Sequence, residues 1–197
     1  MENNNEEISV KDFRISAFDL WDSDWLLLTS GNFLKGKYNA MTVAWGGFGN
    51  MWNLPMALVV VRPTRFTYEF INDYPTFSLC GFPRKYRKAL NLLGTKSGRD
   101  GDKIGEAGLT PVLSQKIDAP TYLQANLSVE CKKIYFQDFD PENFLDDRIE
   151  KHYQLKDYHR MIIGEILYIT GDKKLFERKQ TDKQKIHGLK LLVQQDY

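Results

Sequence analysis

The stretch Asn39-Ala40-Met41-Thr42-Val43-Ala44-Trp45 begins as a loop and continues as a strand, and the rest of the chain can be arranged around it. It offers a side-chain amide at Asn39, a hydroxyl at Thr42 and a series of backbone polar groups. Small residues in the stretch allow a flat ligand to come close to the backbone. We therefore expect these seven residues to form one wall of a binding site for a planar ligand.

Apolar runs on both sides of this stretch predict further strands. Residues 25–30 read as a strand that is buried on both faces, and residues 56–61, with three valines, form the clearest strand. Alternating patterns predict strands over residues 76–82 and 123–136, and residues 160–169 are the last strong strand. Gly164 is expected to mark a bulge or a close approach in the last of them. The glycine-rich residues 46–50 are expected to form a flexible loop.

Short helices are expected between these strands. Thr64 is predicted to cap the N-terminus of a helix that follows Pro63, because its hydroxyl can accept from a first-turn amide. A basic helix is predicted over residues 84–93, closed by Gly94, and a short one over residues 102–107. The lengths and the alternation favour a mainly β fold, an antiparallel barrel with inserted helices, over a parallel βαβ sheet.

The composition is that of an ordinary globular protein. A chain of 197 residues is long enough for one domain with a sizeable core, and its hydrophobic content is 42%. The formal net charge is +1, so no overall field would attract nucleic acid or an acidic membrane. The longest apolar run, residues 56–61, is too short to span a bilayer. We expect neither nucleic acid nor a membrane as a partner.

The two ends of the chain differ from its middle. Residues 1–12 begin with an acidic, Asn-rich segment that has no basic region followed by an apolar one, and we expect them to be a disordered or frayed tail. The absence of a signal peptide favours a cytoplasmic location. Residues 13–175 are expected to form the single domain, and residues 176–197 a charged tail that packs on the body or on a partner subunit.

Cysteine and histidine give no sign of a metal site. Cys80 and Cys131 lie in apolar or alternating runs, which is typical of buried, reduced thiols. The three histidines, His152, His159 and His187, lack metal-ligand spacing with one another and with the cysteines.

Two segments have the composition of a phosphate site. In Arg62-Pro63-Thr64-Arg65, two arginines bracket a hydroxyl and a predicted helix N-terminus, whose free amides favour an anion. In residues 97–103, Gly98 allows close backbone approach, Ser97 can donate, and Lys103 adds a positive charge. The alternatives are a capped helix with two surface arginines in the first case and a polar surface turn in the second.

Three other patterns are weaker. Residues 31–37 match the first seven positions of a P-loop, but Tyr38 stands where Ser or Thr is needed, so a turn between two strands is the better interpretation. The basic residues 84–88 are read as a solvated helix face, with a nicotinamide cofactor's phosphates as a second hypothesis. His159, just before the last strand, is either a hydrogen-bonded structural histidine or a residue that donates to an anionic flavin or receives a proton.

The order of these segments resembles one family. The chain carries, in sequence, Asn39-x-Met41-Thr42-x-x-Trp45, Arg62-Pro63-Thr64-Arg65-Phe66-Thr67, Ser97-Gly98-x-Asp100-x-Asp102-Lys103, Ala107-Gly108-Leu109-Thr110 and His159-x-x-x-x-Gly164-Glu165. Each motif alone is unspecific, but the ordered set is similar to the flavin reductase-like family of FMN-binding split barrels, which includes the flavoredoxins. The resemblance covers residues 18–170.

The resemblance implies an antiparallel, Greek-key-like split β-barrel that forms a homodimer with FMN near the subunit interface. It implies that residues 39–45 lie along the flavin ring, mostly through backbone groups, with Thr42 as the side-chain contact. It also implies phosphate contacts from residues 62–65 and from Ser97, Gly98 and Lys103, and a nicotinamide or flavin contact from His159, the tentative catalytic residue. The glycine-rich and aromatic residues 46–52 depart from the family pattern, which leaves the substrate open.

The function implied by the resemblance is that of an NAD(P)H-dependent flavin reductase. A hydride would pass from NADH or NADPH to bound FMN, and then to a small-molecule or protein electron acceptor. One alternative is an FMN electron carrier of the flavoredoxin kind, without its own nicotinamide turnover. Another is a flavin-binding module with no redox turnover.

Overall fold

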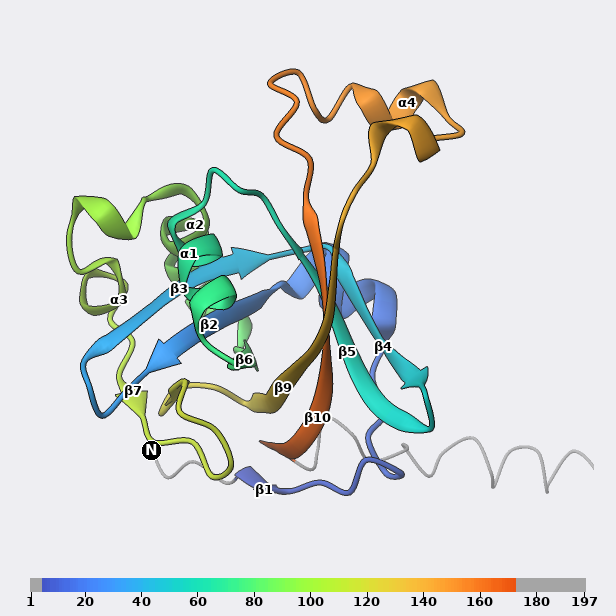
Figure 1. Ribbon diagram of the computed structural model, residues 1–197. Coiled ribbons are helices and arrows are strands. Elements are labelled where there is room, and N and C mark those ends of the chain that lie inside the picture. Colours follow the sequence, from blue (N-terminus) through green and yellow to red (C-terminus); the bar gives the residue numbers. More distant parts are fainter. Residues whose placement is uncertain (1–4, 173–197) are drawn as a thin grey trace, which may run out of the picture.

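An antiparallel sheet with strand order β3-β2-β6-β9-β10-β5-β4 forms the body of the molecule, and β1 adds to β10 (Figure 1). The structure is a computed structural model that describes residues 5–172. The strands are β1 (Asn5–Glu7), β2 (Leu26–Asn32), β3 (Lys37–Val43), β4 (Gly46–Met51), β5 (Leu54–Val61), β6 (Thr76–Gly81), β9 (Leu127–Asp138) and β10 (Arg160–Asp172), with β7 (Pro111–Val112) and β8 (Thr121–Tyr122) forming a separate pair. The predicted mainly β fold with inserted helices is confirmed.

The helices lie in the connections between strands. Those near the site are α1 (Phe66–Asp73), α2 (Arg87–Thr95) and α3 (Lys103–Glu106), and α1 and α2 lie beside β2 and β3 in Figure 1. The short elements are η1 (Asp19–Asp24), η2 (Arg84–Tyr86), η3 (Gly98–Asp100), η4 (Pro141–Asn143) and α4 (Asp147–Glu150). Within the described residues, no helix is long and apolar enough to cross a membrane.

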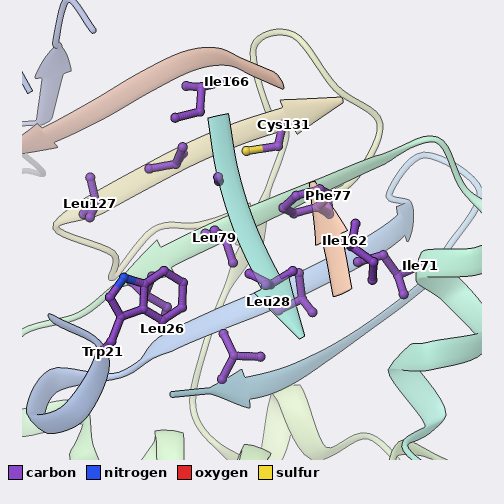
Figure 2. Close-up of a cluster of buried hydrophobic side chains, with 14 of the residues drawn as sticks. Trp21, Leu26, Leu28, Ile71, Phe77, Leu79, Leu127, Cys131, Ile162 and Ile166 are labelled. Carbon is purple, nitrogen blue, oxygen red and sulfur yellow. The ribbon is translucent and has the colours of Figure 1, made fainter. Parts of the chain in front are cut away.

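Two apolar clusters hold the layers together. Leu26 and Leu28 of β2 point into the larger cluster inside the curved sheet (Figure 2), whereas Leu27 points to the opposite face and packs in a second cluster with Leu90 and Leu93 of α2. Because successive residues of a strand face opposite sides, the three consecutive leucines of β2 fill both clusters. This confirms the prediction that the strand is buried on both faces. Each fully buried leucine contributes about 1.5–3 kcal/mol.

Gly164 is both a bulge and a point of close approach, as predicted. The register of β10 against β9 shifts between Ile163 and Gly164. A Cβ atom at Gly164 would lie 2.5 Å from the Phe77 ring and 2.9 Å from Cβ of Cys131. Phe77 therefore packs directly over the glycine backbone, and both cysteines are free and buried, also as predicted.

Two predictions about the ends of strands are wrong. Residues 46–51 are strand β4, not a flexible loop, because their backbone pairs with β5 and Phe48 packs against Trp21 and Phe13. The predicted strand over residues 123–136 begins only at Leu127. The backbone of residues 123–126 instead forms a turn bonded to Thr110 and Gly81.

The helix boundaries also need correction. Thr64 is exposed and does not cap α1, because the N-cap position is occupied by Arg65. The side chain of Arg65 makes no capping hydrogen bond, and its backbone amide donates to the carbonyl of Arg62. Gly94 lies inside α2 and does not close it. Its missing side chain lets the helix approach β3, because a Cβ there would lie 3.2 Å from Cβ of Thr42.

The N-terminal expectation is wrong for the described residues. Asn5–Glu7 pair with β10, the Asn5 amide donates to the carbonyl of Ala125, and Ile8 is buried in the core. The segment from residue 5 onwards is therefore attached to the sheet, and is not a frayed tail. The expected C-terminal tail, residues 176–197, lies outside the described residues.

Candidate functional site

Two adjoining hollows lie where β3 and β5 end and β10 begins. The first, which we call the ring hollow, has a volume of about 160 Å³ and is lined by Met41, Thr42, Val43, Ala44, Trp45, Val60, Arg62, Arg65 and His159. Because β3 stands at one end of the strand order, one edge of its backbone is not used in sheet pairing. The hollow therefore combines apolar side chains with backbone donors and acceptors.

The second hollow, which we call the anion hollow, has a volume of about 70 Å³ and shares Met41 and Arg65 with the first. Its other lining residues come from α1, the end of α2 and the loop before α3, and they are Thr64, Phe66, Thr67, Leu93, Gly94, Thr95, Lys96, Ser97, Gly98 and Lys103. The shared residues place the two hollows side by side, and we call them together the groove. Both contain polar and apolar groups, and Lys96 and Lys103 line the second hollow only.

Lys103 is the buried cation of the anion hollow. Its side chain comes from the start of α3, and its Nζ donates to the carbonyls of Leu93 and Lys96, each at 3.0 Å. These two bonds satisfy carbonyls at the end of α2, where a positive charge is favourable. An ammonium group has three N–H donors, so one remains for a ligand. Burial and the nearby charge of Arg65 lower the pKa of Lys103 to about 8.

The loop that carries Gly98 rests on a buried amide. Asn39 is 5% exposed, and its Nδ2 donates to Oγ1 of Thr67 at 2.7 Å. A Cβ at Gly98 would lie 2.1 Å from Oδ1 of Asn39, so only glycine allows this approach. The next turn is fixed locally, because the Asp102 carboxylate accepts from the amide of Gly105.

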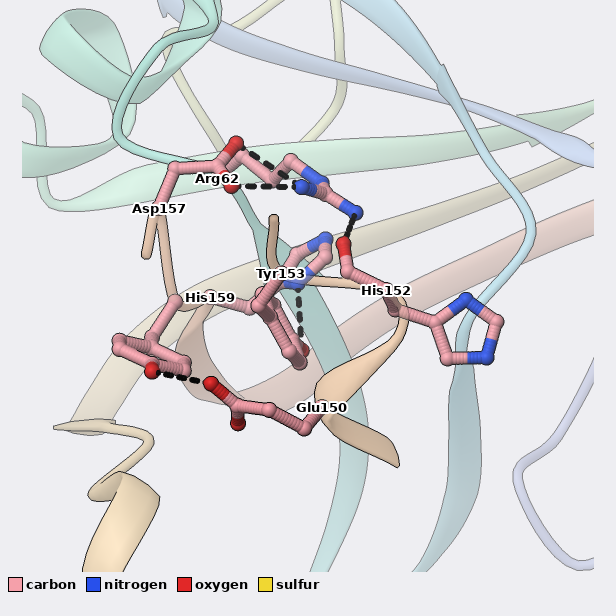
Figure 3. Close-up of polar contacts among 7 residues, drawn as sticks. Arg62, Glu150, His152, Tyr153, Asp157 and His159 are labelled. Atoms are coloured by element: carbon pink, nitrogen blue, oxygen red, sulfur yellow. Dashed lines mark hydrogen bonds and ion pairs between the residues drawn. The ribbon is translucent and has the colours of Figure 1, made fainter. Parts of the chain in front are cut away.

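Residues 139–159, which we call the arm, connect β9 to β10 and extend beyond the ends of both strands (Figure 1). An ion pair fastens the arm to the body. Nη1 of Arg62 lies 2.8 Å from both carboxylate oxygens of Asp157, and Nη2 donates to the carbonyl of His152 (Figure 3). The hydrogen bonds from Arg62 hold the pKa of Asp157 below its usual range.

His159 is the last residue of the arm, and it is 8% exposed. Its Nδ1 lies 2.9 Å from the hydroxyl of Tyr153 (Figure 3). Its ring lies 5.0 Å from the ring of Trp45. Burial is the main reason that its pKa falls to about 4, with a further contribution from the charge of Arg62. His159 is therefore neutral at pH 7.

Most of the residues predicted for the site meet in this groove. Met41 to Trp45, Arg65 and His159 line the ring hollow, and Thr64, Ser97, Gly98 and Lys103 line the anion hollow. Asn39, Ala40 and Pro63 line neither. Asn39 and Ala40 are buried beneath the groove, where Ala40 packs against α2. Arg62 lies in the ring hollow and is engaged by the arm, so its predicted phosphate contact stays a prediction that the geometry does not favour.

Sequence reasoning missed several residues of the groove. Tyr153 and Asp157 fix His159 and Arg62, but they lie in a polar connector with no periodic pattern, and Asp157 is far from Arg62 along the chain. Lys96 and Gly94 line the anion hollow because α2 ends there. A glycine at position 94 is visible in the sequence, but without knowledge of how α2 packs on β3 it is interpreted as the end of a helix.

Comparisons with known proteins agree with this architecture. An uncharacterized protein of Pyrococcus abyssi is 26% identical over 124 residues, which are 62% of this chain and 60% of that protein, so the match spans less than two thirds of the relative. The FMN-binding domain of a flavin reductase-like enzyme from Shewanella baltica is 19% identical with a TM-score of 0.66, covering 90% of this chain and 82% of that one. Flavoredoxin of Desulfovibrio vulgaris is 22% identical with a TM-score of 0.60, covering 86% and 78%.

The structural neighbours confirm the split-barrel fold. The model of the flavin reductase like domain matches residues 24–184, which include every residue of both hollows. This chain therefore belongs to the flavin reductase-like family.

Proposed function

We propose that the groove binds FMN, with the flavin ring in the ring hollow and the phosphate in the anion hollow. The observation that carries this proposal is that the two hollows are adjacent and share Met41 and Arg65. A backbone-edged space with apolar side chains beside a space that contains Lys96 and Lys103 suits a planar ring with a charged tail. The phosphate would meet the free N–H of Lys103, the guanidinium of Arg65 and the Ser97 hydroxyl.

The flavin ring would lie along residues 41–45. The Thr42 hydroxyl already donates to the carbonyl of Leu90, so toward a ligand it can act only as an acceptor. The remaining polar contacts would come from the free backbone edge of β3 and from His159. Trp45 is 44% exposed at the rim, which leaves one side of the ring hollow open to a second reactant.

We propose that the protein is an oxidoreductase of the NAD(P)H-dependent flavin reductase type. FMN would accept a hydride from NADH or NADPH and pass the electrons to an acceptor. The protein residues of the groove need only bind the ring, orient it and supply hydrogen bonds to it. The open rim beside Trp45 supports access for a nicotinamide.

The second candidate is an FMN electron carrier without nicotinamide turnover. Two observations favour it, the fold shared with a flavoredoxin and the shallow, open ring hollow that leaves a bound flavin near the surface. A ring at the surface can exchange electrons with a protein partner without a second small-molecule site.

Titration of the purified protein with FMN, followed by anaerobic mixing, separates these candidates. Quenching of FMN fluorescence with a saturating end point supports the binding site, and the absence of quenching would overturn it. Rapid bleaching of the bound flavin by NADH or NADPH supports the reductase. Bleaching by dithionite alone supports the carrier. An Arg65→Met variant should weaken the binding of FMN more than the binding of riboflavin, since Arg65 lines both hollows and is expected to contact the phosphate.

We also propose that the protein forms a homodimer through the apolar surface at the tip of the β4–β5 hairpin and the neighbouring part of β9. Trp52 and Tyr135 are 57% and 39% exposed there, and their rings lie 6.0 Å apart. Large exposed aromatic side chains that gather in one place are typical of interfaces. Light scattering should give a dimer mass for the wild type and a monomer mass for Trp52→Ser/Tyr135→Ser. A monomeric wild type would contradict the proposal.

A further inference from the structure

We propose that Tyr153 is a positioning residue that fixes the imidazole of His159 in one neutral tautomer, with the proton on Nε2 and available to a ligand in the ring hollow. This inference rests on the proposed function, because the FMN ring is the group that would receive the Nε2–H hydrogen bond. It deepens that proposal by assigning His159 the role of a fixed hydrogen-bond donor, in place of a proton donor.

The first step concerns the hydroxyl of Tyr153. The side chain is buried, with 3% of its surface exposed, and its hydroxyl lies 2.9 Å from Nδ1 of His159. The backbone N–H of His159 also acts on this hydroxyl, but an N–H can only donate, so Nδ1 is the neighbour that can accept the phenol proton. If Nδ1 carried the proton, the phenol O–H would have no acceptor in this buried place, and an unpaired buried donor is unfavourable. Tyr153 therefore donates, and Nδ1 accepts with its lone pair.

The second step concerns the charge of His159. The charged groups around the imidazole are Arg62, Arg65 and Asp157, with His152 as a further titratable neighbour. Burial and the two arginines disfavour an additional positive charge on the imidazole. The carboxylate of Asp157 is hydrogen-bonded to Arg62 through both of its oxygens. A neutral imidazole whose Nδ1 accepts a hydrogen bond must carry its proton on Nε2.

The third step concerns rigidity. Tyr153 stacks on Phe144 with a ring separation of 5.8 Å and an interplanar angle of 12°, and the guanidinium of Arg62 lies 5.2 Å from its ring centre. The same guanidinium is held by Asp157. The arm thus fixes the phenol before a ligand arrives, and the phenol fixes the imidazole. Because Nδ1 is engaged, Nε2 is the nitrogen left for a ligand in the ring hollow that His159 lines.

The test uses the full-length protein with ¹⁵N-labelled histidine, with and without FMN. We expect the His159 signals of the wild type at pH 7 to show an unprotonated Nδ1 and a protonated Nε2. In Tyr153→Phe, the ring packing is kept but the donor is removed, and we expect a mixture of tautomers. The matched control is Tyr158→Phe, because the Tyr158 hydroxyl bonds to Glu150 and not to His159.

The second readout is the rate at which bound FMN is reduced anaerobically. Tyr153→Phe should slow it about fivefold to tenfold, the size expected for the loss of one neutral hydrogen bond, whereas Tyr158→Phe should leave it unchanged. A wild-type spectrum with the proton on Nδ1 would overturn the proposal. So would a Tyr153→Phe protein that keeps the pure Nε2–H tautomer and the wild-type rate. A protein that binds no FMN refutes the proposed function instead, and the tautomer is still decided by the spectrum.

Discussion

Raising the pH from 7 to 9 should weaken the binding of FMN through the titration of Lys103. The amine is 4% exposed and donates to two backbone carbonyls, so its third N–H is the one expected to meet the phosphate. Its pKa in the free protein is lowered to about 8. A dianionic phosphate beside it favours the ammonium form, so the pKa of Lys103 should rise when FMN binds. Binding above pH 8 therefore requires the uptake of a proton.

The size of the effect follows from the fraction of protein that is ready to bind. With a pKa of about 8, roughly nine tenths of the free protein carries the ammonium at pH 7 and roughly one tenth at pH 9. If the bound form has a pKa near the ordinary 10.5, it stays protonated at both pH values. The Kd for FMN should then rise about tenfold from pH 7 to pH 9. The phosphate itself is already dianionic, because its second pKa is about 6.

Fluorescence titrations at pH 7, 8 and 9 measure this dependence. Riboflavin is the matched control ligand, because it has the same ring but no phosphate, and its Kd should change less than twofold. Lys103→Met should bind FMN more weakly at pH 7 and should show no pH dependence between 7 and 9. An FMN Kd that stays within twofold over this range in the wild type would refute the placement of the phosphate at Lys103, as would an equal shift for riboflavin.

Three further perturbations test other parts of the groove. Gly98→Ala would place a Cβ 2.1 Å from the Asn39 amide oxygen, so it should lower the free energy of unfolding in urea by about 1–3 kcal/mol and weaken FMN binding. At Gly47 an added Cβ would meet nothing within 4 Å, so the control Gly47→Ala should change the free energy of unfolding by less than about 0.5 kcal/mol. Asp157→Asn removes the ion pair that fastens the arm and should destabilise the fold by about 1–3 kcal/mol, with slower reduction of bound FMN; unchanged kinetics would exclude a role for the arm in catalysis. The pKa of His159 is lowered to about 4 in the folded state from 6.5, so its contribution to stability is present above pH 6.5 and lost as the pH falls toward 4. Unfolding free energies at pH 7 and pH 5 should show about 2 kcal/mol of this loss in the wild type and not in His159→Gln.

Local sequence patterns predicted those elements whose secondary structure does not depend on which strand they pair with. The continuous apolar run of β5 is buried on any plausible arrangement, and the turn over residues 33–36 between β2 and β3 follows from glycine and asparagine alone. β4 is different, because glycine-rich residues form a strand only when a paired neighbour supplies the hydrogen bonds, and that neighbour is set by the tertiary fold. The split of the segment from residue 123 to residue 136 has the same cause, since its turn is held by Gly81 and Thr110.

The candidate site divides in the same way. Ser97, Gly98 and Lys103, which line one hollow together, could be picked out because glycine and a short polar run are typical of anion-binding loops. The role of Arg62 could not be found, because a guanidinium in a sequence does not reveal whether it meets a phosphate or a carboxylate. Its partner Asp157 comes from the arm, and the choice is made only when β5 and β10 pair and bring the two together.

The pairing of Arg62 with Asp157 affects which residues can bind the phosphate and which can act on the flavin ring. If Arg62 bound the phosphate, the ring end and the phosphate end would share a cation, and any movement of the arm would change affinity for the cofactor. With Arg62 held by Asp157, the proposed phosphate site would depend on Arg65 and Lys103, and the arm would act on the ring hollow through His159. On this proposal, affinity and reactivity would be set largely by separate residues. Variants of the arm should therefore change the rate of flavin reduction more than the Kd for FMN, and variants of the anion hollow should do the reverse.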